Sequence, residues 1–433
     1  MFISILFKVI ISYSLRLTIF DYLIVRYVAN NIKVVCLSDV GLNVLILDIE
    51  RFREDIKALC STKRISIFSL DIGIQDKLTG ISEYRVSHLF KNNNSNNTLI
   101  LPSEIGLVYI RRILPKIMRF MHMDCVMSCG MLYRRNINWE KALSNGSYPF
   151  YCMHREAIGL SKRLSSRINK SFYSLKARKY YGSMLFVGVH HFKNLLLSVG
   201  YIEKERVKVT GSIKIDNLVD MVNKDMFKCS EHSVVLFSFL YTSGIMTTDG
   251  KWSGVGFSKL FNEVHGVVGK FAHMNPSIKV VIKIKWYEKE WIDKIHQSIS
   301  NIGLSYKDIS NLTIKWDVSA QELISRSSTI VGFNSTVITE SLLMRKSTII
   351  PIYEEANDKC REDVLWSDTN DCCIARSNKE LFDLLEESII DSAKCYHPET
   401  DNIMTEAFGY IDGKNSNRLI NEMTNYINTN VGL

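Results

Sequence analysis

The sequence predicts an α/β protein made of two doubly wound domains that face a central cleft. The chain has 433 residues, which is too many for one ordinary hydrophobic core. Its second half alternates short apolar runs with amphipathic segments of helical length, a pattern typical of parallel strands joined by crossover helices. Hydrophobic residues make up 46% and charged residues 23% of the chain, so we expect a folded protein.

The second half shows this alternation most clearly. The expected strands are 234–239, 279–286, 312–316, 329–333 and 347–353, and the expected helices are 257–274, 291–303, 320–327 and one that begins at Ser335. Helical connections of this length predict a parallel sheet that is covered on both faces. Ligands of such sheets bind at the carboxyl ends of the strands, so we expect the functional site at that edge.

The first half is less regular. A helix is expected at 107–120, strands at 125–133, 148–154, 184–190 and 206–211, and a polar connection from 216 to about 231. The KNNNSNNT segment at 91–98 is typical of a solvent loop. The predicted divisions are an N-terminal segment at 1–30, a first domain at 31–225, a second domain at 226–400 and a helical segment at 401–433, whose helix at 416–427 is expected to be a packing element.

Charge and cysteine content narrow the possible functions. The net charge of +9 fits an acidic surface or a phosphorylated substrate, but the Lys and Arg residues form no block of the kind that binds nucleic acid. The ten cysteines include no CxxC pair and no Cys/His spacing suited to zinc. They therefore indicate reduced, mostly buried thiols of a cytoplasmic protein without a metal centre.

The first thirty residues are rich in Ile, Leu and Phe but contain no uncharged span long enough to cross a bilayer. In a helix, Ser4, Lys8, Ser12 and Arg16 form one polar stripe on an otherwise apolar surface. This basic amphipathic segment has two possible roles. It either lies on an anionic membrane as a peripheral contact or packs on the core of the protein.

The strongest candidate site lies in IVGFNSTVITESL, at 330–342. An apolar strand is followed there by Asn334, Ser335 and Thr336, and a helical pattern then begins. Ser and Asn cap helices, so the turn has a local structural explanation. A turn before a helix also offers backbone N–H groups that suit a phosphate. Glu340 lies one turn deeper on the same face, where it would accept from a ribose hydroxyl.

FNSTVITESLLMRKSTIIPIYEEA resembles the nucleotide-binding segment of GT-B glycosyltransferases, especially bacterial enzymes of capsule, lipopolysaccharide and teichoic-acid assembly. The resemblance covers roughly 120–365. It implies two Rossmann-like domains, the first binding the acceptor and the second the nucleotide-sugar. It also implies that Asn334, Ser335, Thr336 and Glu340 contact the nucleotide.

Two further segments resemble elements of related surface-carbohydrate proteins. VTGSIKIDNL at 209–218 is similar to an element that ends the first domain in these families. The resemblance to β-Kdo transferases, which are thought to use a carboxylate near the domain junction, implies that Asp216 is a nucleophile or a positioning carboxylate. YCMHREAIGL at 151–160 is similar to a His-Arg-Glu element, in which Glu156 would be a general acid or base. A structural salt bridge explains Glu156 equally well.

Other candidates follow strand ends. Lys283 and Lys285 alternate on one strand and would neutralise donor phosphate or lie on a solvated edge. Trp252, in a long glycine-rich loop, would stack on a sugar or base. His190 follows an expected strand of the first domain, where it would contact the acceptor or have a structural role. No metal-binding motif is evident, so a metal-independent reaction without a cofactor is expected.

The resulting expectation is transfer of a Kdo-type or other nonulosonic sugar from a CMP donor to a lipid-linked or growing surface glycan. CMP-sugar families commonly carry a His-Pro element near the region of the expected strand at 279–286, where this chain has IKIKW, so a UDP- or GDP-sugar remains an alternative. Further alternatives are polyol-phosphate transfer from a CDP-alcohol and nucleotide-sugar epimerisation. A non-catalytic scaffold in polysaccharide assembly is the alternative from another class.

Overall fold

The structure is a computed structural model of the 433-residue chain. It describes residues 21–47, 49, 52–79, 104–131, 136–144, 148–154, 179–224, 232–241, 256–358, 372–390 and 400–430. Two compact units are formed. The described residues of the first unit lie in 21–154, 179–214 and 414–430, and those of the second lie in 215–413. The two units are thus interleaved along the chain, whereas the sequence-based division uses consecutive ranges.

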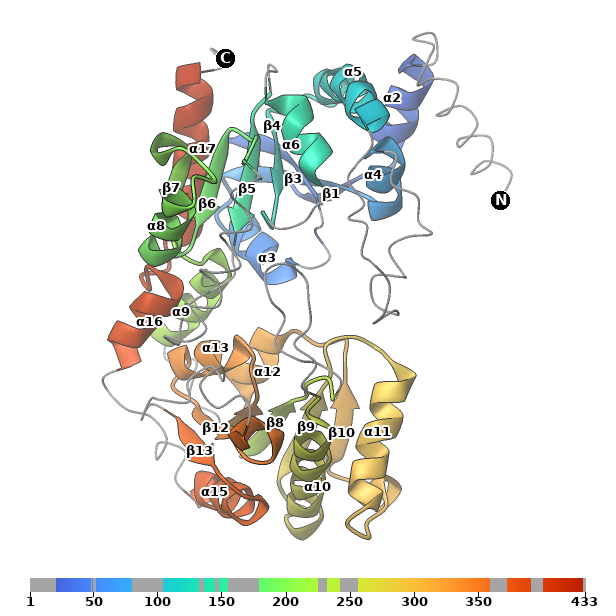
Figure 1. Ribbon diagram of the computed structural model, residues 1–433, viewed down its shortest axis with the longest axis vertical. Coiled ribbons are helices and arrows are strands. Elements are labelled where there is room, and N and C mark those ends of the chain that lie inside the picture. The colour runs from blue at the N-terminus through green and yellow to red at the C-terminus, as the bar shows by residue number, and fades with distance from the viewer. Residues whose placement is uncertain are drawn as a thin grey trace. The chain divides into compact units, whose positions relative to one another are not determined.

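The first unit is built on a seven-stranded sheet (Figure 1). In spatial order its strands are β1 (Ile32–Cys36), β3 (Ile65–Leu70), β2 (Leu42–Ile46), β4 (Cys125–Ser128), β5 (Phe150–His154), β6 (Met184–Val187) and β7 (Val207–Val209). All neighbouring pairs are parallel except β1 and β3, which are antiparallel. The sheet is therefore parallel except at the edge formed by β1, a strand that the sequence did not predict.

Helices surround this sheet. They are α2 (Asp21–Asn30), α3 (Arg53–Ser61), α4 (Ile72–Thr79), α5 (Glu104–Phe120), α6 (Ile137–Leu143), α8 (His190–Ser198) and α17 (Asn415–Asn430). An ion cluster joins α2 to α5, because the buried carboxylate of Asp21 lies 3.1 Å from Arg112 and 2.7 Å from the half-exposed Lys116. The expected packing role of the last helix is confirmed, since α17 packs on the core through Leu419, Ile420 and Met423.

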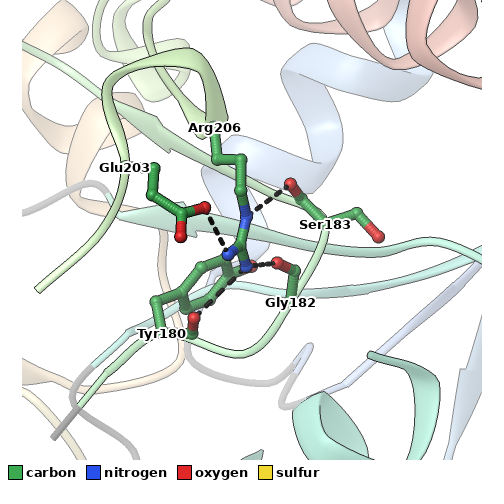
Figure 2. Close-up of polar contacts among 5 residues, drawn as sticks. All are labelled: Tyr180, Gly182, Ser183, Glu203 and Arg206. Atoms are coloured by element: carbon green, nitrogen blue, oxygen red, sulfur yellow. Dashed lines mark hydrogen bonds and ion pairs between the residues drawn. The ribbon is translucent and has the colours of Figure 1, made fainter. Parts of the chain in front are cut away.

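Arg206 fixes the entry to β6 (Figure 2). Its guanidinium donates to the backbone carbonyls of Tyr180, Gly182 and Ser183, and it pairs with Glu203 at 3.0 Å. A guanidinium has five donors in a planar fork, so one side chain satisfies three carbonyl groups of the turn. The turn before β6 is thereby fastened to the segment that leads into β7.

The second unit has a six-stranded sheet with every neighbouring pair parallel. In spatial order its strands are β10 (Leu312–Lys315), β9 (Lys279–Lys283), β8 (Ser233–Phe237), β11 (Thr329–Gly332), β12 (Ser347–Pro351) and β13 (Cys373–Ala375). Its helices are α9 (Asp216–Asn223), α10 (Ser258–Met274), α11 (Lys289–Ser300), α12 (Ala320–Arg326), α13 (Val337–Leu343), α14 (Glu355–Asp358), α15 (Asn378–Ile390) and α16 (Thr400–Phe408). This unit confirms the parallel, doubly wound sheet that the sequence predicted.

Side-chain alternation along the strands builds the two apolar layers of the second unit. In β8, Val234 and Leu236 belong to the core that includes α10 and α11, whereas Val235 and Phe237 belong to the core that includes α9 and α12. Successive residues of a strand point to opposite faces, so a continuous apolar run serves both layers. Figure 1 shows α10 and α11 on one side of this sheet and α12 and α13 on the other.

Two sequence expectations require correction, and two fall outside the described residues. The polar connection expected after Asp216 is instead the helix α9, whose apolar residues pack against the sheet. Cys36 and Cys60 form a disulfide, with Cα atoms 6.0 Å apart, so the thiols are not all reduced. The amphipathic stripe at 4–16 and the loop at 91–98 lie outside the described residues.

Cys125, Cys129, Cys152 and Cys372 are all buried, as the sequence predicted for most of the cysteines. Within the described residues, none of the helices combines the length and the apolarity needed to cross a membrane.

Candidate functional site

The carboxyl edge of the second sheet is defined by strands that end in register. Lys315 of β10 lies opposite Lys283 of β9, Lys283 lies opposite Phe237 of β8, and Phe237 lies opposite Gly332 of β11. The chain runs from β8 to β9 and β10 and then returns to the other side of β8 as β11. The edge between β8 and β11 is therefore the topological switch point, where open α/β sheets bind ligands.

A strained turn follows β11 at this switch point. Asn334 has φ of +47°, a left-handed conformation that Asn tolerates better than most residues. The residue before this turn, Phe333, packs its ring against two others, with its centroid 5.1 Å from that of Phe239 and 4.9 Å from that of Phe257. Gly332 permits the close approach of α13, because a Cβ atom there would lie 3.2 Å from Ile338.

The hydroxyl of Ser335 makes a local hydrogen bond. It accepts from the backbone N–H of Val337 at 3.4 Å, and the carbonyl of Ser335 accepts from Ile338 at 3.2 Å. Thr336 occupies the N-cap position of α13. No side-chain capping hydrogen bond is made from this N-cap position, so the local contact of Ser335 is a turn contact two residues along the chain. Since α13 has only seven residues, any ligand at this turn would rely on its backbone N–H groups and hydroxyls more than on a long helix dipole.

Glu340 lies on α13 and is buried, with 5% of its surface exposed. One of its carboxylate oxygens accepts from the side-chain amide of Gln321, on α12, at 3.4 Å. Gln321 is equally buried. Glu340 therefore joins two helices on the same face of the sheet, and the expected ribose contact stays a prediction.

Lys283 and Lys285 have different environments, although the sequence placed them on one strand face. Strand β9 ends at Lys283, whose ammonium is buried and donates to the carbonyls of Ile284 at 2.6 Å and Trp316 at 3.0 Å. Burial lowers the pKa of Lys283, and nearby Asp317 partly opposes this effect. Lys285 is exposed and lies over the ring of Trp286, 5.6 Å from its centroid. Lys283 thus ties the ends of β9 and β10 together, whereas Lys285 presents its charge at the surface.

Three exposed aromatic rings lie just beyond β9 and β10. Trp286, Tyr287 and Trp316 have 46%, 59% and 41% of their surfaces exposed. The rings of Tyr287 and Trp316 are in edge contact, with centroids 5.0 Å apart. Exposed rings that lie together at a strand edge are a candidate binding surface. We call these three residues the aromatic group. Sequence analysis missed it, although Trp286 and Trp316 each follow a Lys and occupy the last position of an expected strand, and Tyr287 comes next after Trp286.

A hydrogen-bonded chain of side chains lies at the end of β8. The hydroxyl of Ser238 contacts Nε2 of His265 at 2.8 Å, and Nε1 of Trp291 donates to the same hydroxyl at 2.8 Å. His265 is fully buried on α10, and its Nδ1 lies 2.7 Å from the carbonyl oxygen of Phe261. Burial lowers the pKa of His265 to about 4, although the bond to Phe261 favours the charged form. The sequence pattern contained no signal for this arrangement, because its members are far apart in the chain.

The remaining candidates have diverse positions. Asp216 is buried at the first turn of α9, where a carboxylate is favourable near the helix N-terminus. His190 is exposed and begins α8, separated by two residues from the end of β6. Glu156 and Trp252 lie outside the described residues, so their expected roles stay predictions.

Two other features of the described residues bear on the site. No group of three or more His, Cys, Asp or Glu side chains among them is arranged to hold a metal ion. A pocket of about 470 Å³ lies beyond β12 and β13, and its lining includes Tyr353, Arg376 and Lys379. Tyr353 and Arg376 follow the carboxyl ends of β12 and β13, so this pocket lies along the same edge of the sheet, displaced from the switch point between β8 and β11.

Comparison with known proteins establishes the fold. No protein-family model matches the sequence, and no curated protein matches it. Solved structures match over nearly the whole chain. A UDP-N-acetylglucosamine 2-epimerase has a TM-score of 0.51 at 11% identity, covering 91% of this chain and 97% of its own. MnaA of S. aureus, solved with UDP, has a TM-score of 0.50 at 15% identity, with 90% and 97% covered.

A third match extends the likeness to an archaeal protein. The UDP-GlcNAc 2-epimerase from Methanocaldococcus jannaschii has a TM-score of 0.50 at 13% identity, with 88% of this chain and 99% of that chain covered. These matches confirm the predicted fold class. The chain is an α/β protein of the GT-B type, with two Rossmann-like units.

Proposed function

We propose that this chain is a UDP-sugar-using enzyme of the GT-B fold that binds its nucleotide at the carboxyl edge of the second sheet. The observation that carries the proposal is the arrangement at this edge. The turn at Asn334 lies at the switch point, and Lys285 and the aromatic group lie beyond two strands of the same sheet. A turn with backbone N–H donors and a cation suit the diphosphate of a nucleotide, and exposed rings suit its base.

In this proposal, each part of the nucleotide has its own contact. The diphosphate lies against the turn formed by Asn334, Ser335 and Thr336 and accepts hydrogen bonds from its backbone N–H groups and hydroxyls. Lys285 lies beyond the end of β9 and neutralises part of the negative charge of the diphosphate. The base stacks on the aromatic group, and Glu340 accepts from the ribose. Lys283 is assigned a structural role, since two backbone carbonyls already occupy its ammonium.

The choice of UDP departs from the CMP donor that the sequence favoured. The structural matches supply the reason, because two of them are named as UDP-N-acetylglucosamine 2-epimerases and the third is a complex with UDP. The absence of a His-Pro element near the expected strand at 279–286 agrees with this choice. Kdo transfer from CMP is therefore the less favoured alternative.

For the reaction, we propose sugar transfer to a glycan acceptor, with Glu156 and Asp216 as the carboxylates that act on the reacting atoms and His190 and Trp252 as acceptor or sugar contacts. The names of the matched structures support epimerisation at C2 of the sugar as a second candidate. The two reactions differ in their products. Transfer or hydrolysis releases UDP, whereas epimerisation retains the nucleotide–sugar bond.

One experiment tests both levels of the proposal. The full chain is incubated with UDP-N-acetylglucosamine, with and without glycan acceptors, and the products are followed by NMR. Release of UDP supports transfer, and appearance of the 2-epimer without UDP release supports epimerisation. The variants Glu156→Gln and Asp216→Asn are expected to lose turnover and retain the fold. If the wild-type chain neither binds nor converts a UDP-sugar, the scaffold alternative is favoured.

A further inference from the structure

The backbone holds Ser238 at the carboxyl edge of the second sheet. It directly follows β8, and its N–H donates to the carbonyl of Lys283 at 2.9 Å, continuing the pairing of β8 with β9. Its side chain is partly exposed. The next strand on its other side is β11, so Ser238 lies at the same switch point as the turn at Asn334. Backbone hydrogen bonding between β8 and β9 therefore fixes the position of Ser238. The direction of its hydroxyl depends on the side chains that contact it.

The ring of His265 sets the direction of that hydroxyl. A carbonyl oxygen only accepts hydrogen bonds, so the 2.7 Å contact with Phe261 assigns the ring proton to Nδ1. The ring is fully buried and neutral at neutral pH, which leaves Nε2 as an acceptor. The hydroxyl of Ser238, 2.8 Å away, must then donate its proton to Nε2.

Trp291 occupies one acceptor position of the same oxygen. An indole N–H only donates, and Nε1 of Trp291 lies 2.8 Å from Oγ of Ser238. A hydroxyl has one proton and two lone pairs. Once the proton points to His265 and one lone pair accepts from Trp291, a single lone pair is left for a ligand. Ser238 therefore meets a ligand only as a hydrogen-bond acceptor.

We propose that Ser238 is a specificity-determining residue that accepts a hydrogen bond from a hydroxyl or amide N–H on the sugar of the bound nucleotide-sugar. The inference rests on the proposed function and deepens it. Ionised phosphate oxygens are acceptors, so they gain nothing from this lone pair. The sugar is thereby directed to the end of β8, and the diphosphate to the turn after β11. His265 and Trp291 act through Ser238 and are positioning residues.

The test compares two ligands that differ only in the sugar. Isothermal titration calorimetry measures the affinity of the full-length wild type, Ser238→Ala and Ser238→Thr for UDP and for UDP-N-acetylglucosamine. Ser238→Ala is expected to lose about tenfold in affinity for the nucleotide-sugar, the usual effect of one lost hydrogen bond, and less than about twofold for UDP. Ser238→Thr retains the hydroxyl and is expected to retain the preference. Ser238→Cys, whose thiol is a weak acceptor, replaces the alanine variant if that variant does not fold.

The outcomes separate the two proposals. Equal losses for both ligands, or no loss for either, would overturn the role of Ser238 while leaving the nucleotide site intact. Failure of the wild type to bind UDP would overturn the proposed function and the role of Ser238 with it. Nitrogen-15 NMR of labelled histidine gives a second, ligand-free readout. The proposal requires His265 to carry its proton on Nδ1, and a proton on Nε2 at neutral pH would contradict it.

Discussion

The hydroxyl oxygen of Ser238 lies 2.8 Å from Nε2 of His265, although the two residues are 27 positions apart and belong to different elements. Ser238 follows β8, and His265 lies in the middle of α10. The contact connects the carboxyl edge of the sheet to a helix in the layer behind it. Because His265 holds the hydroxyl of Ser238, this polar group at the edge of the sheet keeps one orientation, and fixed polar groups are a condition for selective binding.

The stability of the protein should depend on pH through His265. Its pKa is lowered to about 4 in the folded chain, whereas an unfolded histidine has a pKa near 6.5. Between these values the unfolded state binds the proton and the folded state does not. The free energy of unfolding should therefore be fully retained above pH 6.5 and fall by about 1.4 kcal/mol per pH unit as the pH decreases towards 4.

Urea unfolding of the wild type and His265→Gln at pH 7, 6 and 5 measures this dependence. The variant has no imidazole, so the difference in stability between the two proteins should shrink as the pH falls. Other titrating groups contribute equally to both proteins and cancel in the difference. Parallel pH profiles for the two proteins would show that His265 is not buried in its neutral form.

Lys283 and Lys285 provide a matched pair, since they are two residues apart and have different environments. Lys283→Met removes charge-assisted bonds to the carbonyls of Ile284 and Trp316, and should lower the free energy of unfolding by about 2 kcal/mol. Lys285→Met should change stability by less than about 0.5 kcal/mol, because the side chain is exposed. In calorimetry, Lys285→Met should weaken UDP binding, and the loss should diminish at high salt. If Lys285→Met instead lowered the stability and Lys283→Met weakened UDP binding, the structural role would belong to Lys285 and the binding role to Lys283.

Asn334 should tolerate glycine and resist β-branched residues, because its φ is +47°. Asn334→Gly is expected to preserve stability within about 0.5 kcal/mol, since Gly adopts this conformation without strain. Asn334→Val is expected to destabilise by about 1–2 kcal/mol, as left-handed conformations do for residues with a bulky Cβ. Chemical denaturation of both variants measures the difference. Equal stabilities would mean that the turn relaxes out of the left-handed region.

Arg206 should contribute to stability through shape as well as charge. Arg206→Ala leaves the carbonyls of Tyr180, Gly182 and Ser183 without their donor, and should cost about 2–3 kcal/mol. Arg206→Lys keeps the charge but lacks the planar fork, so it should recover only part of this loss. Thermal unfolding of the three proteins gives the order. A lysine variant as stable as the wild type would show that charge alone is sufficient.

Local pattern predicted the fold class, whereas the side-chain environments at the carboxyl edge depend on packing between distant segments. The strands at 279–286 and 329–333 were predicted from apolar runs, and the edge that they form follows from parallel pairing. The separate environments of Lys283 and Lys285 were not predicted, because they depend on where β9 ends and on the backbone of the neighbouring β10. The contacts of Ser238 with His265 likewise depend on packing between distant segments, which one sequence does not encode as a local signal.

The central claim is that the carboxyl edge of the second sheet binds a uridine diphosphate. Calorimetric titration of the full-length chain with UDP and CMP, repeated with the double variant Ser335→Ala/Thr336→Ala, tests it most directly. We expect UDP to bind more tightly than CMP, and the double variant to lose about tenfold or more of the affinity for UDP while remaining folded. Unchanged affinity in the double variant, or no heat of binding with UDP, would contradict the account.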